Sequence, residues 1–241
     1  MWTDLIAGAK QLVFPDNCFL CRRYLNNRHQ SQLCQACLAT IKRNVPPFCL
    51  QCSRHLDHYT AEGLCAACLK HHYHFDSCQS ACVYDEAFGK MLHAFKYNGK
   101  TAWQKTFLML MREFIESYSV GLEKFDLIAP IALHPARLRE RGYNQAQILS
   151  QGISQFYRLP HAADLLLRTR MTDTQTRLQQ KQRWTNLQGA FRINPSMTVV
   201  EKSILLVDDL LTTGATADAA AKCLKDAGAA YVGVLTVAIT P

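Results

Sequence analysis

The sequence predicts an α/β protein in which a mainly parallel sheet follows a small cysteine-rich module. Eight cysteines recur in a duplicated pattern over residues 18–68, and strand-like and helical segments alternate after residue 76. The apolar run at residues 204–207 then leads directly into two aspartates and a turn of threonines. Alternating strands and helices favour a parallel sheet with helices on both faces. We therefore expect a module at residues 1–70 and an α/β domain at residues 71–241.

The cysteine pattern predicts two zinc sites. Each cysteine of the second set lies 31 residues after its counterpart in the first, and the sets are Cys18, Cys21, Cys34 and Cys37, then Cys49, Cys52, Cys65 and Cys68. Two cysteines separated by two residues aim both sulfurs at one ion, and two such pairs complete a tetrahedral four-cysteine site. Four thiolates leave no open coordination position, so both ions are expected to be structural. The spacing leaves open whether each repeat binds its own ion or the pairs cross between the repeats.

Composition favours a cytoplasmic metalloprotein. The chain has eleven cysteines but no long apolar segment at its start, so metal ligation is favoured over disulfides. No apolar run reaches the roughly 18 residues that a membrane span needs, so no membrane insertion is expected. The formal charge of +8 falls to about +4 if each four-thiolate zinc site carries −2. Basic side chains concentrate at residues 137–192, ten against three acidic ones, and nearly all are arginines, which suit phosphate oxygens.

The segments after residue 76 define the expected elements. Apolar spacing of helical period predicts helices at residues 101–118, 143–157 and 215–228. Buried strands are expected at residues 125–133, 203–208 and 230–239, with a short strand near residues 163–167. We expect a polar loop at residues 134–142, a mobile segment at 168–188 and a hinge at 69–77.

The acidic pair and the turn after it predict a sugar-phosphate site. Asp208 and Asp209 are expected at the carboxyl end of a strand, where open parallel sheets bind ligands. The turn that follows leads into a helix, and it contains Thr212, Thr213, Gly214, Ala215 and Thr216. Amides at a helix N-terminus and threonine hydroxyls suit a terminal phosphate, whereas carboxylates suit the hydroxyls of a diol. The alternative, in which the aspartates only cap a helix, is disfavoured.

Residues 94–101 fit a loose P-loop pattern, but an ATP site is disfavoured. A phosphate cradle of that type needs small residues directly after a strand. Here Phe95, Lys96 and Tyr97 are bulky, and the residues before them predict a helix.

Residues 204–216, ILLVDDLLTTGAT, resemble the phosphoribosyl pyrophosphate (PRPP) motif of type I phosphoribosyltransferases at all thirteen positions. In that family the acidic pair binds the ribose 2′ and 3′ hydroxyls, and the loop after it binds the 5′-phosphate. The resemblance implies a type I phosphoribosyltransferase-like fold that binds PRPP with magnesium. It also implies a catalytic role for Asp208 and Asp209, which would steady the ribose as positive charge develops at its anomeric carbon.

Other segments extend the resemblance over nearly the whole chain. Residues 84–100, 130–149 and 186–191 and the pair Thr174-Gln175 are similar to the ComF/GntX family. That family couples a double zinc ribbon to a phosphoribosyltransferase-like domain and is associated with natural competence, the uptake of single-stranded DNA. The resemblance implies that the loop after residue 131 faces pyrophosphate, with roles for Arg137, Arg139, Arg141 and Lys96. The chain departs from the family at Gln179-Gln180-Lys181, where a Ser-Arg pair is expected.

Three functions remain open at this point. The chain is a phosphoribosyltransferase with an unidentified acceptor, a PRPP-binding protein whose client is single-stranded DNA, or an adaptor whose ribbon docks a competence helicase or other DNA-uptake or recombination proteins. The resemblance favours a cytoplasmic PRPP-binding protein of competence, and the alternative is a conventional transferase of nucleotide or amine metabolism. Candidates for stacking on bases are Tyr24, Phe48, Tyr73 and Trp184.

Overall fold

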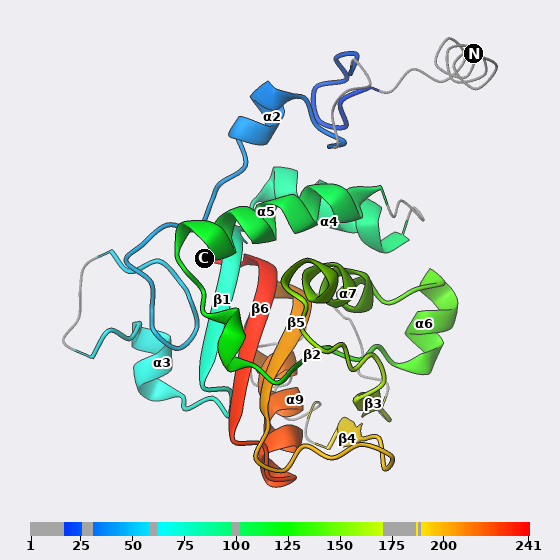
Figure 1. Ribbon diagram of the computed structural model, residues 1–241. Coiled ribbons are helices and arrows are strands. Elements are labelled where there is room, and N and C mark those ends of the chain that lie inside the picture. Colours follow the sequence, from blue (N-terminus) through cyan, green and yellow to red (C-terminus); the bar gives the residue numbers. More distant parts are fainter. Residues whose placement is uncertain (1–16, 26–30, 58–61, 98–101, 171–186, 188) are drawn as a thin grey trace.

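A four-stranded parallel sheet forms the centre of the protein (Figure 1). The computed structural model describes residues 17–25, 31–57, 62–97, 102–170, 187 and 189–241. The strand order is β1 (Ser77–Val83), β6 (Tyr231–Ile239), β5 (Ser203–Leu211) and β2 (Leu127–Pro130), and every neighbouring pair is parallel. A small antiparallel sheet joins β3 (Leu166–Arg168) to β4 (Phe191–Ile193). The predicted fold class, a mainly parallel α/β sheet, is confirmed.

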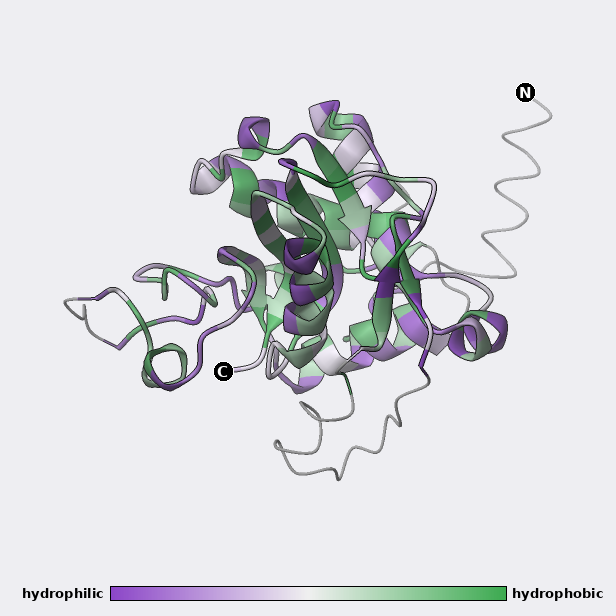
Figure 2. Cartoon of the chain, turned by 90° about the horizontal axis from the view of Figure 1, so that it is seen from below, coloured by the Kyte–Doolittle hydropathy of each residue, from purple (hydrophilic) through white to green (hydrophobic). Residues whose placement is uncertain are grey.

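Helices cover both faces of the central sheet. One face carries α4 (Glu86–Tyr97), α5 (Trp103–Ser117) and α7 (Gln145–Tyr157), and the other carries α9 (Ala215–Asp226) beside the β3–β4 sheet. The shorter helices are α2 (Gln35–Ala39), α3 (Ala66–Lys70), η1 (Leu122–Lys124) and α6 (Pro135–Arg141). Side chains of β5 alternate between the two cores, because successive residues of a strand point to opposite faces. Figure 2 shows the hydrophobic segments gathered in the strands between these layers.

The expected helices at residues 101–118, 143–157 and 215–228 are confirmed as α5, α7 and α9. The expected loop at residues 134–142 is wrong, because most of it is helix α6. His134 caps α6 by accepting a hydrogen bond from the Ala136 amide at 3.2 Å, Pro135 opens it, and Gly142 closes it in the left-handed conformation. Proline at the start and glycine after the end are typical bounds of a helix, so these two residues delimit α6 and do not mark a loop.

Strand β1 lies outside the strands that the sequence predicts. It contains two serines, a glutamine and two cysteines, and Val83 is its only β-branched residue, the type that favours strands. The segment before the second ribbon covers the outer edge of β1: the Asn44 amide donates to the Ala81 carbonyl at 3.0 Å, and its side chain donates to the Ser80 carbonyl at 3.1 Å. An uncovered edge strand would invite pairing with another chain. Tertiary pairing therefore makes this segment a strand.

The two ribbons attach to different parts of the α/β domain. The first lies against α4 and α5, where Phe19 packs edge-on against the buried Trp103 at 5.0 Å between ring centroids. The second lies beside β1 and has a small core of its own, which includes Leu56. The expected hinge at residues 69–77 is wrong in its last part, because the Asp76 amide donates to the Val232 carbonyl at 2.8 Å. The domain boundary between residues 70 and 71 stays a prediction.

Candidate functional site

Each cysteine repeat forms its own four-cysteine cluster. The four sulfurs of each repeat lie within 4.8 Å of one another, and the Sγ–Sγ distances Cys21–Cys34 and Cys52–Cys65 are both 3.7 Å. Zn–S bonds of about 2.3 Å in a tetrahedron place sulfurs about 3.8 Å apart, so both clusters fit zinc. The pairing that the spacing left open is therefore within each repeat.

The acidic pair lies where β5 extends beyond its neighbour β2. The expected strand end at residue 208 is three residues short, because β5 continues to Leu211 while it pairs with β6. On the other side, β2 ends at Pro130, opposite Val207. One edge of β5 is therefore unpaired with β2 from Asp208 onward. This is the carboxyl end of parallel strands, the position at which open α/β sheets bind ligands.

A buried ion pair joins helix α4 to the acidic pair. Lys96 Nζ lies 2.7 Å from Asp209 Oδ2, and the Asp209 side chain is only 9% exposed. Burial, the largest single effect, lowers the pKa of Lys96, but the charge and hydrogen bond of Asp209 together with the charge of Asp208 outweigh it, so the pKa lies above its ordinary value. Because Lys96 lies in the last turn of α4, the P-loop interpretation of residues 94–101 is not supported: Phe95, Lys96 and Tyr97 are helical.

Asp208 is held in a partly protonated state. Its Oδ1 accepts a hydrogen bond from the Asp209 amide at 2.8 Å. Burial and the adjacent Asp209 carboxylate raise the pKa of Asp208 to about 7, although Lys96 and Arg168 act in the opposite direction. Strongly shifted carboxyl groups of this kind concentrate at functional sites.

Three arginines gather near the acidic pair. Arg137 and Arg141 lie four residues apart on α6 and therefore on one face of it, and Arg168 ends β3. Burial and repulsion from Arg137 and Arg141 lower the pKa of Arg168, while Asp208 raises it. These charges are thus close enough to act on one another. Arg139 is exposed on the other side of α6, so the structure brings Lys96, Arg137 and Arg141 together but leaves Arg139 apart.

Arg168 is the candidate site residue that the sequence did not single out. In the sequence it appears only as one member of the basic stretch, without a role of its own. Its position at the end of β3 gave no signal, because β3 belongs to the small antiparallel sheet and not to the parallel sheet whose carboxyl ends bind ligands. Gln179-Gln180-Lys181 and Trp184 lie outside the described residues, as does most of the segment expected to be mobile.

The loop after β5 has the backbone geometry of an anion cradle. Gly214 precedes α9 with a φ of +80°, a conformation that a β-carbon disfavours, and an added Cβ would lie 2.7 Å from the Tyr73 ring. Thr213 Oγ1 accepts a hydrogen bond from the Ala215 amide at 3.4 Å. Within the described part of the chain, the amides of Thr213 and Gly214 donate no hydrogen bond. These amides and the N-terminus of α9 are therefore available to an anion.

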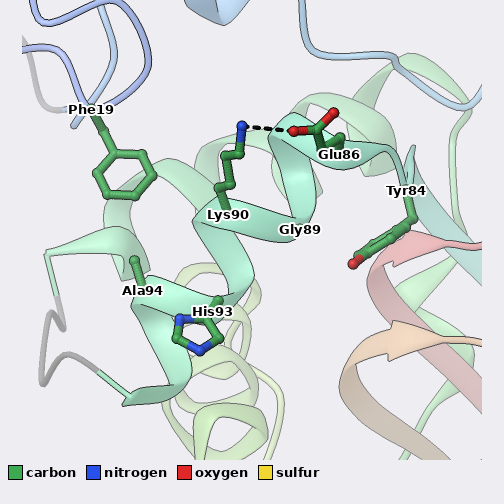
Figure 3. Close-up of a pocket in the computed structure, with 7 residues that line it drawn as sticks. All are labelled: Phe19, Tyr84, Glu86, Gly89, Lys90, His93 and Ala94. Carbon is green, nitrogen blue, oxygen red and sulfur yellow. Dashed lines mark ion pairs between the residues drawn. The ribbon is translucent and has the colours of Figure 1, made fainter. Parts of the chain in front are cut away.

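A separate hollow lies between the first ribbon and α4 (Figure 3). It has a volume of about 410 Å³, and Phe19, Tyr84 and Lys90 are among its lining residues. The 2.8 Å ion pair between Lys90 and Glu86 occupies its polar side. The hollow contains no residue of the acidic pair or of the phosphate loop (residues 212–216), so it is distinct from the candidate site.

Among the described residues, no helix has the length and apolar character that crossing a bilayer requires.

Replacing Asp208 with Asn is expected to stabilise the folded protein as pH rises. The folded-state pKa of about 7 lies above the ordinary value of 3.8, so ionising Asp208 weakens folding between these two pH values. Asn carries no charge but still accepts the hydrogen bond from the Asp209 amide. We expect a gain on the order of 2 kcal/mol at pH 8 and almost none at pH 4, after allowance for partial exposure. Urea denaturation at the two pH values measures this; an equal gain at both would contradict the assignment.

Comparisons with known proteins agree with the two-part architecture. A family model described as a double zinc ribbon domain matches residues 9–82. The chain is 30% identical over 156 residues to Competence protein F of Haemophilus influenzae, a match that covers 63% of this chain and 67% of that protein. It is 29% identical over 225 residues to DNA utilization protein YhgH of Salmonella typhimurium, covering 92% of this chain and 96% of that protein.

Among solved structures, the glutamine PRPP amidotransferase from B. subtilis complexed with ADP and GMP is similar with a TM-score of 0.36 and 19% identity. The match covers 55% of this chain and 25% of that chain. A TM-score this low does not define a shared fold, so the family rests on the sequence relationship. Because identity of 30% to Competence protein F extends over two thirds of that protein, the chain belongs to the ComF family.

Proposed function

We propose that the chain binds PRPP, accompanied by magnesium, at the carboxyl end of β5. The observation that carries this proposal is the continuity of one strand, loop and helix. The acidic pair on β5, of which Asp209 is buried, is followed four and five residues later by two amides that donate no hydrogen bond in the described part of the chain, and then by the N-terminus of α9. Carboxylates suit a diol and free amides suit a phosphate, so the geometry fits a phosphorylated ribose.

Each part of PRPP would meet a different group. The 5′-phosphate would bind the loop of residues 212–216, and the ribose hydroxyls would donate hydrogen bonds to Asp208 and Asp209. The pyrophosphate would face the cluster of Arg137, Arg141 and Arg168, whose mutual repulsion an anion would relieve. Magnesium prefers oxygen ligands. Because Lys96 already neutralises Asp209, the ion would enter together with the pyrophosphate oxygens.

Phosphoribosyl transfer is the second candidate. In that reaction the bond from the anomeric carbon to pyrophosphate breaks with its electrons on the leaving oxygen, and a bond to the acceptor forms. The acidic pair favours this chemistry, because carboxylate oxygens beside the ribose would stabilise the positive charge that develops there. The arginines would neutralise the departing pyrophosphate.

The family relationship supports a role in competence, with single-stranded DNA as the client in the cytoplasm. The relatives bear the names Competence protein F and DNA utilization protein. Among the aromatic residues considered for base stacking, Tyr24 is 53% exposed, whereas Phe48 packs against Phe114 and Tyr73 packs against Phe75. DNA binding would therefore depend mainly on basic side chains such as Arg139, and it would weaken steeply with added salt. A competence helicase or another DNA-uptake protein is the proposed protein partner.

Titration calorimetry of PRPP with magnesium into zinc-loaded protein tests the proposal. We expect saturable PRPP binding, no binding of ATP, and loss of PRPP binding in the Asp208→Asn, Asp209→Asn double variant with two zinc ions retained. Asp226→Asn is the matched control, because Asp226 pairs with Lys222 on the exposed side of α9. Heat that continues after saturation would indicate turnover. Unchanged binding by the double variant would refute the site.

A further inference from the structure

We infer that the second zinc ribbon positions the phosphate loop, and that Arg54 is the positioning residue through which it does so. The inference rests on the proposed function, since it concerns the regulation and geometry of the same PRPP site. It assigns to one half of the double ribbon a role within the binding site. The other half, although it is a copy of the same unit, has no such contact among the described residues.

Two side chains from the ribbon side hold consecutive carbonyl groups of the loop. Arg54 Nη2 donates to the Thr212 carbonyl at 2.5 Å, and Tyr73 Oη donates to the Thr213 carbonyl at 3.1 Å. These pairs are 158 and 140 residues apart in the sequence. A charged guanidinium donor makes the first bond stronger than an ordinary one.

These two bonds, together with one that Thr240 Oγ1 donates to the Thr212 carbonyl at 3.2 Å, determine where the amides of the loop point. The Thr212 carbonyl and the Thr213 amide belong to one peptide plane, and the Thr213 carbonyl and the Gly214 amide belong to the next. In a trans peptide the carbonyl and the N–H point in opposite directions. Holding both carbonyls towards the ribbon therefore turns both amides away from it. Neither of these two amides donates a hydrogen bond within the described part of the chain, so the ribbon sets the orientation that a phosphate would need.

Further contacts prevent the loop from rotating. The Tyr73 ring lies against Gly214, where an added Cβ would approach it to 2.7 Å. The His74 amide donates to Asp218 Oδ1 at 2.5 Å, and His74 Nδ1 lies 3.0 Å from the same oxygen. Asp218 is buried in the first turn of α9. The segment that leaves the second ribbon therefore holds both the loop and the helix that follows it.

The zinc knuckle fixes the backbone of Arg54. The Cys49 amide donates to the Arg54 carbonyl at 2.7 Å, and the Ser53 amide donates to the Cys49 carbonyl at 2.9 Å. Ser53 has a φ of +66°, which closes this tight turn around the metal ligands. Arg54 is partly buried beside the Cys52 sulfur, while its side chain reaches the loop. Metal binding at the second site would thus fix the backbone of Arg54, whose side chain donates to the phosphate loop.

The first repeat provides a natural comparison. Arg23 occupies the position equivalent to Arg54, and the Cys18 amide donates to its carbonyl at the same 2.7 Å. Its side chain, however, is exposed. The two arginines therefore share a knuckle geometry but differ in what the side chain contacts.

Binding of two fragments of PRPP by wild type, Arg54→Gln, Arg54→Lys and Arg23→Gln tests the inference. Ribose 5-phosphate reports on the loop, and magnesium pyrophosphate reports on the arginine side of the site. We expect Arg54→Gln to weaken ribose 5-phosphate and PRPP binding on the order of 10- to 100-fold, with pyrophosphate binding and two zinc ions retained. Arg54→Lys should recover part of the loss, and Arg23→Gln should match wild type.

The outcomes separate the inference from the proposed function. If wild-type protein binds no PRPP, the proposed function fails. If wild type binds PRPP and Arg54→Gln binds ribose 5-phosphate equally well, the positioning role fails while the site stands. If Arg54→Gln loses both fragments together or loses zinc, Arg54 supports the fold as a whole, and the specific role in the loop is also overturned.

Discussion

Protein carrying Cys34→Ser is expected to bind one zinc ion instead of two and to lose the folded structure of its first ribbon. Structural zinc contributes about 10–16 kcal/mol of binding free energy, which in small modules is folding free energy. The ribbon has few other sources of stability, and its packing includes Phe19 against the buried Trp103. Loss of this ribbon should therefore expose part of the surface of α4 and α5. Atomic absorption measures the zinc content, and thermal denaturation measures the loss of folded structure.

The equivalent change in the second repeat separates the roles of the two zinc ions. Cys65 occupies the position of Cys34 in its own repeat, and both side chains are partly buried. Cys65→Ser should likewise remove one zinc ion, but it should also weaken PRPP binding, because the knuckle that holds Arg54 would be lost. Cys223→Ser is the control, since Cys223 lies on α9 outside both clusters. Retention of two zinc ions by either ligand variant would contradict the assignment of four-cysteine sites.

Replacing Lys96 with Met is expected to destabilise the protein by about 3 kcal/mol at pH 8, because removing one partner of a buried ion pair leaves the other charge uncompensated. The 2.7 Å contact to Asp209 would be lost, and the pKa of Asp208, already raised to about 7 by burial and by Asp209, would rise further without the ammonium. A folded-state pKa above the unfolded value lowers stability as pH rises. The deficit should therefore be larger at pH 8 than at pH 5.

Urea denaturation of single and double variants at both pH values measures this coupling. Asp209→Asn added to Lys96→Met should recover much of the lost stability, since neither charge is then unpaired. Lys90→Met is the control, because Lys90 lies on the same helix in an exposed pair with Glu86. A deficit that does not change with pH, or that the second substitution does not relieve, would show that Lys96 acts through packing alone.

Local patterns were sufficient for most elements of the α/β domain, although not for β1 or α6, and for the ligands that lie near one another in sequence. The two four-cysteine zinc sites were predictable from the spacing, because two cysteines separated by two residues can aim both sulfurs at one ion. Helices α5, α7 and α9 follow from apolar residues at helical period. The motif at residues 204–216 placed the acidic pair and the phosphate loop on one continuous strand, loop and helix. The prediction of a loop at residues 134–142 was wrong, because Pro135 and Gly142 are typical of helix boundaries as well as of loops.

The sequence by itself thus determined the zinc ligands, most of the helices and strands of the α/β domain, and the acidic pair with its threonine turn, since each depends on residues that lie close together in the chain. Only the tertiary structure decided which repeat holds which ion, that Lys96 pairs with Asp209, and that Arg168 joins Arg137 and Arg141. The same holds for Arg54, which meets the phosphate loop 158 residues away. Periodicity reports which side of an element is buried, but not which distant side chain faces it. That information exists only once the chain has folded.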